Sequence, residues 1–276
     1  MIACLPRSAA TLLFVDVDGI RRSGILDIIA GPKSAGGKVT EDADYKNFVA
    51  GTGFDYQRDL KEVAGAFRAG DSFFLLSGNF DWKRLDAYAL AQGGTCRDGF
   101  CRVKSSQPGR WVSFYKVRSN AMALAFSANE FAALDVAPRP AAGGSPDQIP
   151  NAPVWVWVPA AALRGAALPA GTRSFTSPME NAEQILFSLG PRNGALEMDL
   201  DVQCVSAAAA SDLLVKLEGA TNMLRKLIER EHVQPNPNDL SGLLTSGAFR
   251  REDRKVLGMW PIRKEFLESV ASGGVK

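Results

Sequence analysis

The sequence has a single histidine, His232, among its 276 residues. One imidazole excludes sites that need two, such as His-rich zinc centres, metalloprotease helices and di-iron bundles. The sequence has no apolar run near the roughly 20 residues that a membrane-spanning helix needs, so we expect no transmembrane segment. Its 32 Lys and Arg residues nearly balance 30 Asp and Glu residues, leaving a net charge of +2. This charge gives no general attraction to nucleic acid, so we expect no nucleic-acid partner.

Motifs that bind common cofactors are also missing from the sequence. There is no Gly-x-Ser-x-Gly elbow, no phosphate-binding loop and no dinucleotide fingerprint, so we expect no cofactor. What the sequence does have is an ordinary globular composition, with 46% apolar and 22% charged residues. Its length suits one large domain or two domains of about 130 residues each.

Residues 138–153 are rich in Pro, Gly and Ala, which is typical of a linker between folded parts. We therefore expect a first half over residues 1–137 and a second half over residues 154–276. Each half opens with a buried strand that runs into a short helix, over Phe14–Gly24 and Val154–Gly165.

A second pair of segments also matches between the halves. In Ser77–Leu85 and in Leu257–Phe266, a strand leaves through Gly and an aromatic residue into a helix with two basic residues. Together the two matches favour an internal duplication of an α+β unit.

Alternating and apolar runs predict strands that arrive mostly as hairpins, with helices between them. Hairpins favour mixed or antiparallel sheets with packed helices over a doubly wound parallel sheet, so we predict an α+β fold with two similar α+β halves. The predicted hairpins are 64–67 with 72–79, 111–117 with 121–126, and 183–189 with 195–205; the longest predicted helix runs from 206 to about 232, and Pro261 is predicted to start a last helix.

The second of the strands in the 183–205 hairpin alternates between apolar and acidic residues. Glu197, Asp199 and Asp201 all point to one side, which must meet water or a partner, so these three residues are a candidate partner face. In the strand 154–158, Trp155 and Trp157 point to one side, and we expect both to be buried.

The four cysteines bear on the compartment. Cys96 and Cys101 bracket Asp98-Gly99, a strong tight-turn pair, so a hairpin there would bring them to disulfide distance. Free thiols and a metal site are the alternatives. Met1-Ile2-Ala3-Cys4 resembles the end of a bacterial lipoprotein leader, which makes Cys4 a candidate for lipidation and a membrane tether. The alternative is a start codon followed by an ordinary Cys, because no basic and apolar leader precedes it.

Asp16 and Asp18 stand two residues apart at the end of an apolar strand and are followed by Gly19. This segment resembles the first motif of haloacid-dehalogenase-type phosphatases. In that family the first carboxylate attacks phosphorus, the second protonates the leaving oxygen, and Mg²⁺ neutralises both. Ser77, at the end of another apolar strand, resembles the phosphate-binding residue of the second motif. The resemblance implies a cytoplasmic magnesium-dependent phosphatase that uses Asp16, Asp18 and Ser77.

Three departures from that family favour a structural role for the same residues. Ile20 stands where the family has Thr, the closing acidic motif is absent, and the predicted hairpins do not fit the family's parallel sheet. In the structural interpretation, Asp16 is an ordinary polar position, and Asp18 caps a short helix that begins near Gly19.

The opening segment also resembles that of uncharacterised exported bacterial α+β proteins. Leu5-Pro6, the strand Leu12–Val17 and the following Arg21-Arg22-Ser23-Gly24-Ile25-Leu26 carry this likeness. It implies export and no catalytic residue. We therefore expect a non-catalytic binding or structural protein, exported or periplasmic and lipid-anchored if Cys4 is modified. The alternative is the cytoplasmic phosphatase. The sequence names no ligand or partner.

Overall fold

The computed structural model describes residues 1–8, 10–22, 42–68, 70–136, 145–146, 149–165, 179, 181–192, 195–230, 240–263, 265–267 and 269. The chain divides into two compact units, with a boundary between Ser145 and Pro146. That boundary falls inside the segment 138–153, which the composition marks as a linker. His232 lies outside the described residues.

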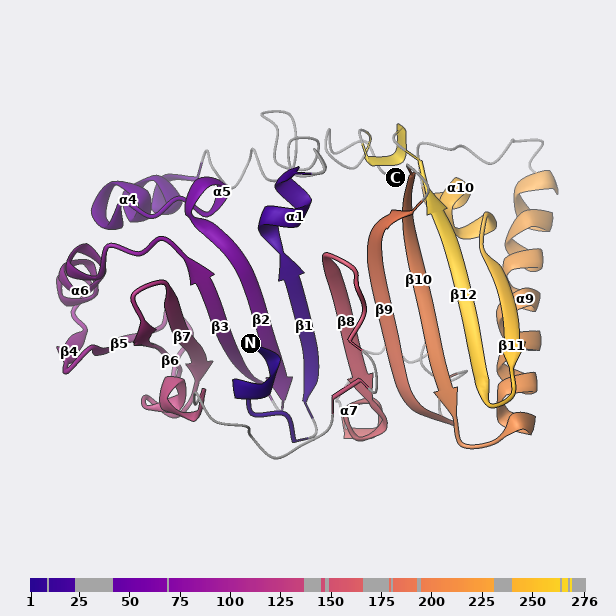
Figure 1. Ribbon diagram of the computed structural model, residues 1–276, viewed down its shortest axis with the longest axis horizontal. Helices are drawn as coiled ribbons and strands as arrows, with labels where there is room; N and C mark the ends of the chain where they lie inside the picture. Colours follow the sequence, from indigo (N-terminus) through magenta and orange to yellow (C-terminus); the bar gives the residue numbers. More distant parts are fainter. Residues whose placement is uncertain are drawn as a thin grey trace. The chain divides into compact units, whose positions relative to one another are not determined.

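The first unit combines an antiparallel sheet with helices (Figure 1). Its elements are η1 (Ile2–Cys4), β1 (Thr11–Asp16), α1 (Val17–Arg22), α4 (Ala43–Thr52), α5 (Tyr56–Asp59), β2 (Leu60–Arg68), β3 (Asp71–Gly78), α6 (Trp82–Ala91), β4 (Thr95–Arg97), β5 (Phe100–Lys104), β6 (Trp111–Arg118), β7 (Ala121–Ser127) and η2 (Ala132–Asp135). The strands are hydrogen-bonded in the order β1-β2-β3-β7-β6-β5-β4.

The second unit has the same kind of architecture. Its elements are β8 (Val154–Pro159), α7 (Ala160–Gly165), β9 (Ala182–Arg192), β10 (Ala195–Cys204), α9 (Ala207–Arg230), α10 (Leu240–Thr245), β11 (Ala248–Glu252) and β12 (Lys255–Ile262). Its strands are hydrogen-bonded in the order β8-β9-β10-β12-β11. Neighbouring strands pair antiparallel in both units, which confirms the predicted α+β class.

The two units share one order of elements. Each begins with a strand that runs directly into a short helix, continues with a hairpin, crosses by a helix, and returns with a second hairpin. The sheet order β1-β2-β3-β7-β6 therefore matches β8-β9-β10-β12-β11 strand for strand, with β4 and β5 as an addition in the first unit. In this comparison, β3 of the first unit occupies the same place as β10 of the second unit. The sequence match between Ser77–Leu85 and Leu257–Phe266 instead joins β3 to β12, so it relates strands that occupy different places.

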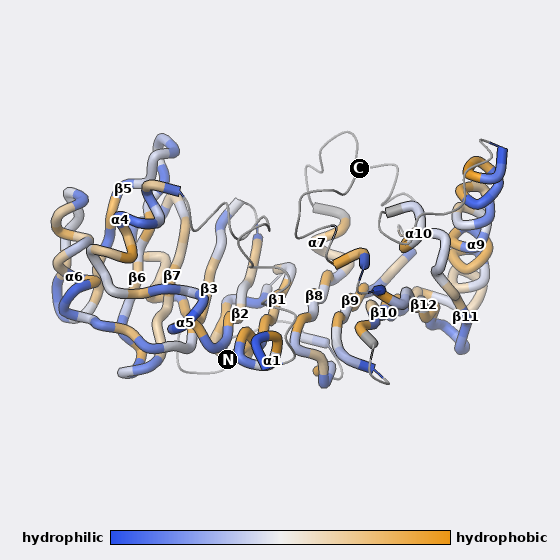
Figure 2. The backbone as a smooth tube through the Cα atoms, turned by 90° about the horizontal axis from the view of Figure 1, so that it is seen from above, coloured by the Kyte–Doolittle hydropathy of each residue, from blue (hydrophilic) through white to orange (hydrophobic). Residues whose placement is uncertain are grey.

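The helices of the second unit cover one face of its sheet. In Figure 2, α7, α9 and α10 lie on the same side of β8 to β12. Ala210 and Leu213 of α9 are buried against Val202 of β10 and Val256 of β12 in a hydrophobic core. Because side chains alternate along a strand, residues next to these in sequence point to the opposite face.

In the first unit, α6 packs on its sheet through Leu85 and Ala89, which are buried with Phe114 and Met122. The helix begins at Trp82 because the Asp81 side chain accepts a hydrogen bond from the backbone N–H of Arg84, as the sequence predicts.

Two sequence expectations about element ends are wrong. Pro261 does not start a helix: β12 runs on to Ile262, with Pro261 opposite Glu197 of β10. A proline is tolerated there because the pairing of β12 with β11 ends at Met259, so its missing N–H leaves no gap in that ladder. The strand β9 likewise continues through Gly190 and Pro191 to Arg192 instead of ending at Leu189.

Candidate functional site

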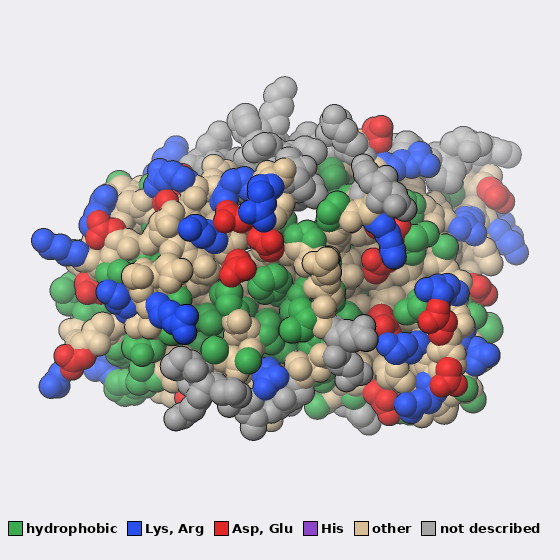
Figure 3. All heavy atoms as spheres, viewed as in Figure 1, with side chains coloured by type: hydrophobic (Ala, Val, Ile, Leu, Met, Phe, Trp, Pro, Cys, Tyr) green, Lys and Arg blue, Asp and Glu red, His purple; other side chains and the backbone are tan. Residues whose placement is uncertain are grey.

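A cavity of about 840 Å³ lies on the face of the second sheet opposite the described helix α9. We call it the groove. Such a volume is typical of a site for a small organic ligand. It is lined by strand residues and by the segment that precedes β8, namely Pro146, Ile149, Pro150, Asn151, Trp157, Gln184, Leu186, Ser188, Arg192, Asp199, Leu200, Asp201, Ala248, Phe249, Arg250, Lys255, Leu257, Gly258 and Met259. Acidic and basic side chains gather over β10, β12 and β11 on this face (Figure 3).

The sheet face that carries the groove has two rows of residues that lie directly opposite one another across the strands. The first row runs from β8 to β11 through Trp157, Leu186, Asp201, Leu257 and Arg250. At a strand spacing of about 4.8 Å, it covers about 19 Å. Partners in an antiparallel pair share a face, so all five side chains belong to one surface.

The second row is offset by two residues along each strand. It runs through Trp155, Ser188, Asp199, Met259 and Ala248. Both rows therefore place an indole at one end and a carboxylate in the middle, and the candidate partner face belongs to the same surface as the two tryptophans.

Trp157 is the largest side chain of the groove. Only 4% of its surface is exposed, and its indole N–H donates a hydrogen bond of 2.8 Å to Oε1 of Gln184. Trp155 is buried on the same face, at 1% exposure. These values confirm the prediction that both indoles point to one side and are buried.

Ion pairs cross the polar part of the groove. Nη1 of Arg192 lies 2.6 Å from Oε1 of Glu197 and 3.4 Å from Oδ1 of Asp199. Nζ of Lys255 lies 3.0 Å from Oδ2 of Asp201. One guanidinium, that of Arg192, thus serves two carboxylates, whereas Asp201 has the ammonium group of Lys255 to itself.

The Asp199 carboxyl group is perturbed by this arrangement. Its burial in the groove raises its pKa above the usual range, and the neighbouring negative charge of Glu197 raises it further, while Arg192 acts in the opposite direction. Asp199 is therefore a partly desolvated carboxyl group that shares its guanidinium partner with Glu197.

The two aspartates of the phosphatase motif have structural partners in the first unit. Oδ1 of Asp16 accepts a hydrogen bond of 2.8 Å from the backbone N–H of Gly19, so Asp16 caps α1. Asp18 lies within that helix and forms an ion pair with Arg21. The expectation that Asp18 is the cap is therefore wrong; the helix begins two residues earlier than expected.

Ser77 lies in a row with Asp16, and Glu62 stands between them. Asp16 of β1 is opposite Glu62 of β2, which is opposite Ser77 of β3, so Asp16 and Ser77 are two strands, or about 10 Å, apart. Glu62 and Ser77 line a smaller cavity of about 250 Å³, together with Cys4. Glu62, which lies between Asp16 and Ser77, has no equivalent in the phosphatase motifs described above.

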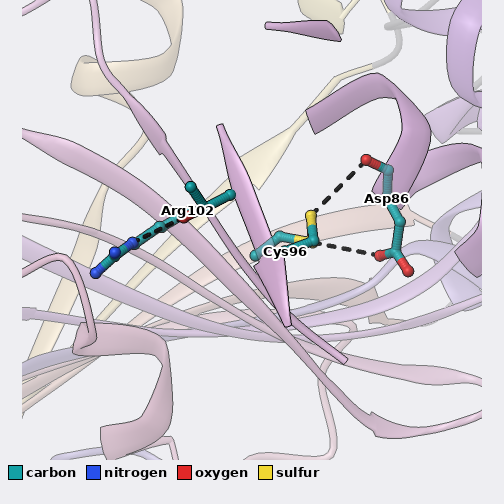
Figure 4. Close-up of a disulfide and its surroundings, with 5 residues drawn as sticks. Asp86, Cys96 and Arg102 are labelled. Carbon is teal, nitrogen blue, oxygen red and sulfur yellow. Dashed lines mark hydrogen bonds between the residues drawn. A yellow bond between two sulfur atoms is a disulfide. The ribbon is translucent and has the colours of Figure 1, made fainter. Parts of the chain in front are cut away.

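Cys96 and Cys101 form a disulfide, as one of the sequence interpretations predicts. They are opposite one another in the β4–β5 hairpin, whose turn residues Asp98 and Gly99 both have positive φ, at 52° and 79°. Asp86 of α6 lies beside them (Figure 4). Because the two sulfurs are bonded to each other, they are not the thiolates that a metal ion would need. Cys4 and Cys204 are free, and Cys204 is buried as expected.

Comparison with known proteins adds a fold and no family. No protein-family model matches the chain, and no curated protein matches it. The chain is similar to two solved structures described as crystal forms of TP0453. Form I has a TM-score of 0.52 and 14% identity over 100% of this chain and 97% of that chain. Form III has a TM-score of 0.51 and 14% identity over 99% and 97%. This similarity concerns the fold alone.

Sequence reasoning found the acidic half of the groove and missed the rest. Arg192 falls in the turn predicted between residues 189 and 195, Trp157 falls in a predicted buried strand, and no motif in the sequence marks Arg250 or Lys255 as site residues. The missing information is the pairing of β8 with β9 and of β10 with β12, which joins residues about 30 to 60 positions apart into one surface.

Proposed function

We propose that this chain is a non-catalytic, exported binding protein, and that the groove binds an amphipathic organic cation. The observation that carries the proposal is the pair of cross-strand rows, which put a buried indole and two leucines beside carboxylates in one cavity of ligand size. Trp157, Leu186 and Leu257 would contact the apolar body of the ligand, and Asp199 would bind its positively charged group.

The ion pairs of the groove favour a cation at Asp199. Among the described residues, the lining has three basic side chains (Arg192, Arg250, Lys255) and two acidic ones (Asp199, Asp201). Lys255 and Arg250 each pair with one carboxylate, that of Asp201 and that of Glu252, whereas Asp199 shares Arg192 with Glu197. An ammonium group beside Asp199 would give that carboxylate a cationic partner of its own. Both groups would then be partly removed from water. Hydrogen bonds between charged partners are stronger than neutral ones, typically by about 1 to 2 kcal/mol.

The experiment is a calorimetric titration with three probes that share one apolar body: 4-phenylbutylammonium, 4-phenylbutanol and 4-phenylbutyrate. We expect the ammonium to bind at least about tenfold more tightly than the carboxylate. Asp199→Asn should remove this preference and leave binding of the alcohol unchanged. The matched control is Asp212→Asn, which deletes the same charge on α9, on the other face of this unit. Equal binding of all three probes, or tighter binding of the carboxylate, would refute the proposal.

Export is supported by the disulfide, because such bonds persist in oxidising compartments and are rare in the cytosol. We further propose that Cys4 tethers the chain to a membrane through a lipid. Among the described residues, no helix is both long and apolar enough to cross a bilayer. Mass spectrometry of the protein from membrane fractions tests the tether: an unmodified Cys4 in all of the protein would refute it.

An internal duplication is supported by the shared order of elements in the two units. In this proposal, β1 and α1 correspond to β8 and α7. The corresponding face of the first sheet is covered by its own chain, with Leu5 and Ala10 before β1 and Ala133 of η2 all completely buried. The cavity lined by Glu62 and Ser77 in the first unit measures about 250 Å³, against about 840 Å³ for the groove, so ligand binding would belong to one copy of the repeat.

A further inference from the structure

The disulfide of the first unit has a carboxyl group in contact with it. Oδ1 of Asp86 lies 3.3 Å from Sγ of Cys101, and the backbone oxygen of Asp86 lies 3.7 Å from Sγ of Cys96 (Figure 4). Asp86 belongs to α6, which packs on the β4–β5 hairpin through Leu85 and Ala89. The carboxyl group is therefore held against the disulfide by the helix that carries it.

The two sulfurs differ in access. Cys101 is completely buried in the core of the first unit, whereas Cys96 is partly exposed. Cys96 is therefore the more accessible of the two residues to a nucleophile from solvent, and the Cys101 sulfur is the one that would leave into the interior. A thiolate leaving into a buried position needs a proton or a positive charge, because burial disfavours the charged form.

We propose that Cys96 and Cys101 form a thiol–disulfide exchange site, in which Asp86 exchanges a proton with the sulfur of Cys101. The co-reactant is a dithiol, either a small molecule or a protein. Its thiolate attacks Sγ of Cys96, the bond between the two cysteine sulfurs breaks, and Cys101 leaves with the electron pair and takes the proton of the Asp86 carboxyl group. The second thiolate of the dithiol then attacks the mixed disulfide and releases Cys96 as a thiolate, which takes a proton from water.

The balance of this sequence is two electrons from the dithiol to the protein. The dithiol becomes a disulfide, the two cysteines become thiols, and Asp86 regains its proton from solvent. In the reverse direction the Asp86 carboxylate removes the proton of the Cys101 thiol. Once the Cys96 thiolate has attacked a partner disulfide and released one partner thiol, the resulting Cys101 thiolate attacks Sγ of Cys96 in the mixed disulfide. This closes the protein disulfide and releases the partner as a dithiol, so two electrons pass from the protein to the partner, which is reduced.

The surroundings of Asp86 suit a group that carries a proton. Its burial raises its pKa above the usual range, and Lys116 of β6 acts weakly in the opposite direction. The other charged groups of the hairpin do not contact it. Arg97 and Asp98 pair with each other in the exposed turn. Arg102, next to Cys101, points away from Asp86, to the opposite side of the strand, and pairs with Glu130 (Figure 4).

The test is the rate at which dithiothreitol reduces the disulfide of the full chain, followed by alkylation and intact mass. The rate constant is calculated from the concentration of the dithiothreitol thiolate, so that the ionisation of the reagent does not contribute to the pH dependence. For the parent it should fall as the pH rises through the pKa of Asp86, because the acid form is lost. For Asp86→Asn it should be independent of pH and at least about tenfold lower at acidic pH, where Asp86 still carries its proton.

The matched control is Asp98→Asn, which deletes a negative charge from the same hairpin without touching the disulfide. Asp98 has φ 52°, which Asn also adopts readily, so this variant should fold as the parent does. Circular dichroism and thermal midpoints establish that both variants are folded. If Asp86 only repelled negative charge, Asp86→Asn would react as fast as the parent at acidic pH, where Asp86 is uncharged, and faster than the parent at higher pH. That result would overturn the proposal.

A second experiment identifies the sulfur that is attacked. On treatment with glutathione disulfide, Cys101→Ser should form a stable mixed disulfide at Cys96 and release one molecule of reduced glutathione. Cys96→Ser should leave Cys101 resistant to glutathione disulfide and to alkylation under native conditions, because its sulfur is buried. Modification of Cys101 at a rate equal to that of Cys96 would contradict the proposed direction of attack. These results do not depend on whether the groove of the second unit binds a ligand.

Discussion

Trp157 and Asp201 lie on the same face of the second sheet, because both are neighbours of Leu186. The indole comes from β8, on one side of Leu186, and the carboxylate comes from β10, on the other side. An apolar ring and an acid are thereby held about 10 Å apart across three strands. This fixed separation between an apolar contact and an acidic one leads us to a ligand with an apolar body and a cationic end.

The first prediction concerns Trp157. Truncation to Ala should lower the free energy of unfolding by about 3 to 5 kcal/mol, because a large buried aromatic ring and its hydrogen bond to Gln184 are lost. Chemical denaturation measures this change. Trp157→Phe should cost less, since it keeps most of the apolar contact and loses the N–H donor.

Met259→Ala is the control for Trp157. Met259 lines the same groove, but 38% of its surface is exposed, so its truncation should change stability by less than about 1 kcal/mol. A Trp157→Ala variant that unfolds at the same denaturant concentration as the parent would show that the indole is not part of a packed core.

The second prediction follows from the raised pKa of Asp199. A carboxyl group whose pKa is raised in the folded state contributes stability below its unfolded pKa and loses that contribution as the pH rises through the folded value. Asp199→Asn, which cannot ionise, should therefore gain stability relative to the parent as the pH rises from about 3.9 to neutrality. Denaturation midpoints across this range provide the measurement. A parent that gains stability over Asp199→Asn with rising pH would mean that Arg192 outweighs burial.

The elements that local chemistry determines were predictable. Asp81 begins α6 by capping it, and Asp98-Gly99 closes the β4–β5 hairpin, because both depend on residues within a few positions of one another. The end of β12 was not predictable in this way. Pro261 reads as a helix start in isolation, and only the end of pairing with β11 shows why a strand accepts it.

The third prediction is that the disulfide is present in protein isolated without reductant. Intact mass should increase by two alkyl groups at Cys96 and Cys101 only after reduction. A loop of this size gives about 2 kcal/mol of stabilisation in the chain-entropy account. The Cys96→Ser, Cys101→Ser double variant should therefore be folded and about that much less stable. Two thiols at these positions that are alkylated without reduction would contradict the prediction.

The fourth prediction separates the structural role of Asp16 from the catalytic one. Asn also caps helices, so Asp16→Asn should leave stability nearly unchanged, whereas Asp16→Ala should cost about 1 kcal/mol. We expect no magnesium-dependent turnover of a generic phosphate ester by the parent above the blank. Turnover that disappears in Asp16→Asn would instead support the haloacid-dehalogenase-like phosphatase.

The groove shows what a single sequence can give of a site. Alternation identified Glu197, Asp199 and Asp201 as one face of a strand, because a period of two is visible locally. It could not show that Arg192 reaches Glu197 and Asp199, since that contact depends on β9 extending three residues past its expected end at Leu189, into the expected turn. Trp157 reads as core, and it is buried; its place at the edge of a cavity depends on sheet register.

The most direct measurement is the indole N–H signal of Trp157 in a proton–nitrogen correlation spectrum, assigned by its absence in Trp157→Phe. Titration with 4-phenylbutylammonium should shift this signal saturably, because the indole lines the groove. The signals of Trp82 and Trp111, in the first unit, should stay in place, and the shift at Trp157 should weaken in Asp199→Asn. A Trp157 signal that stays unchanged at saturating probe, or a shift equal for 4-phenylbutyrate, would contradict ligand binding of this kind in the groove.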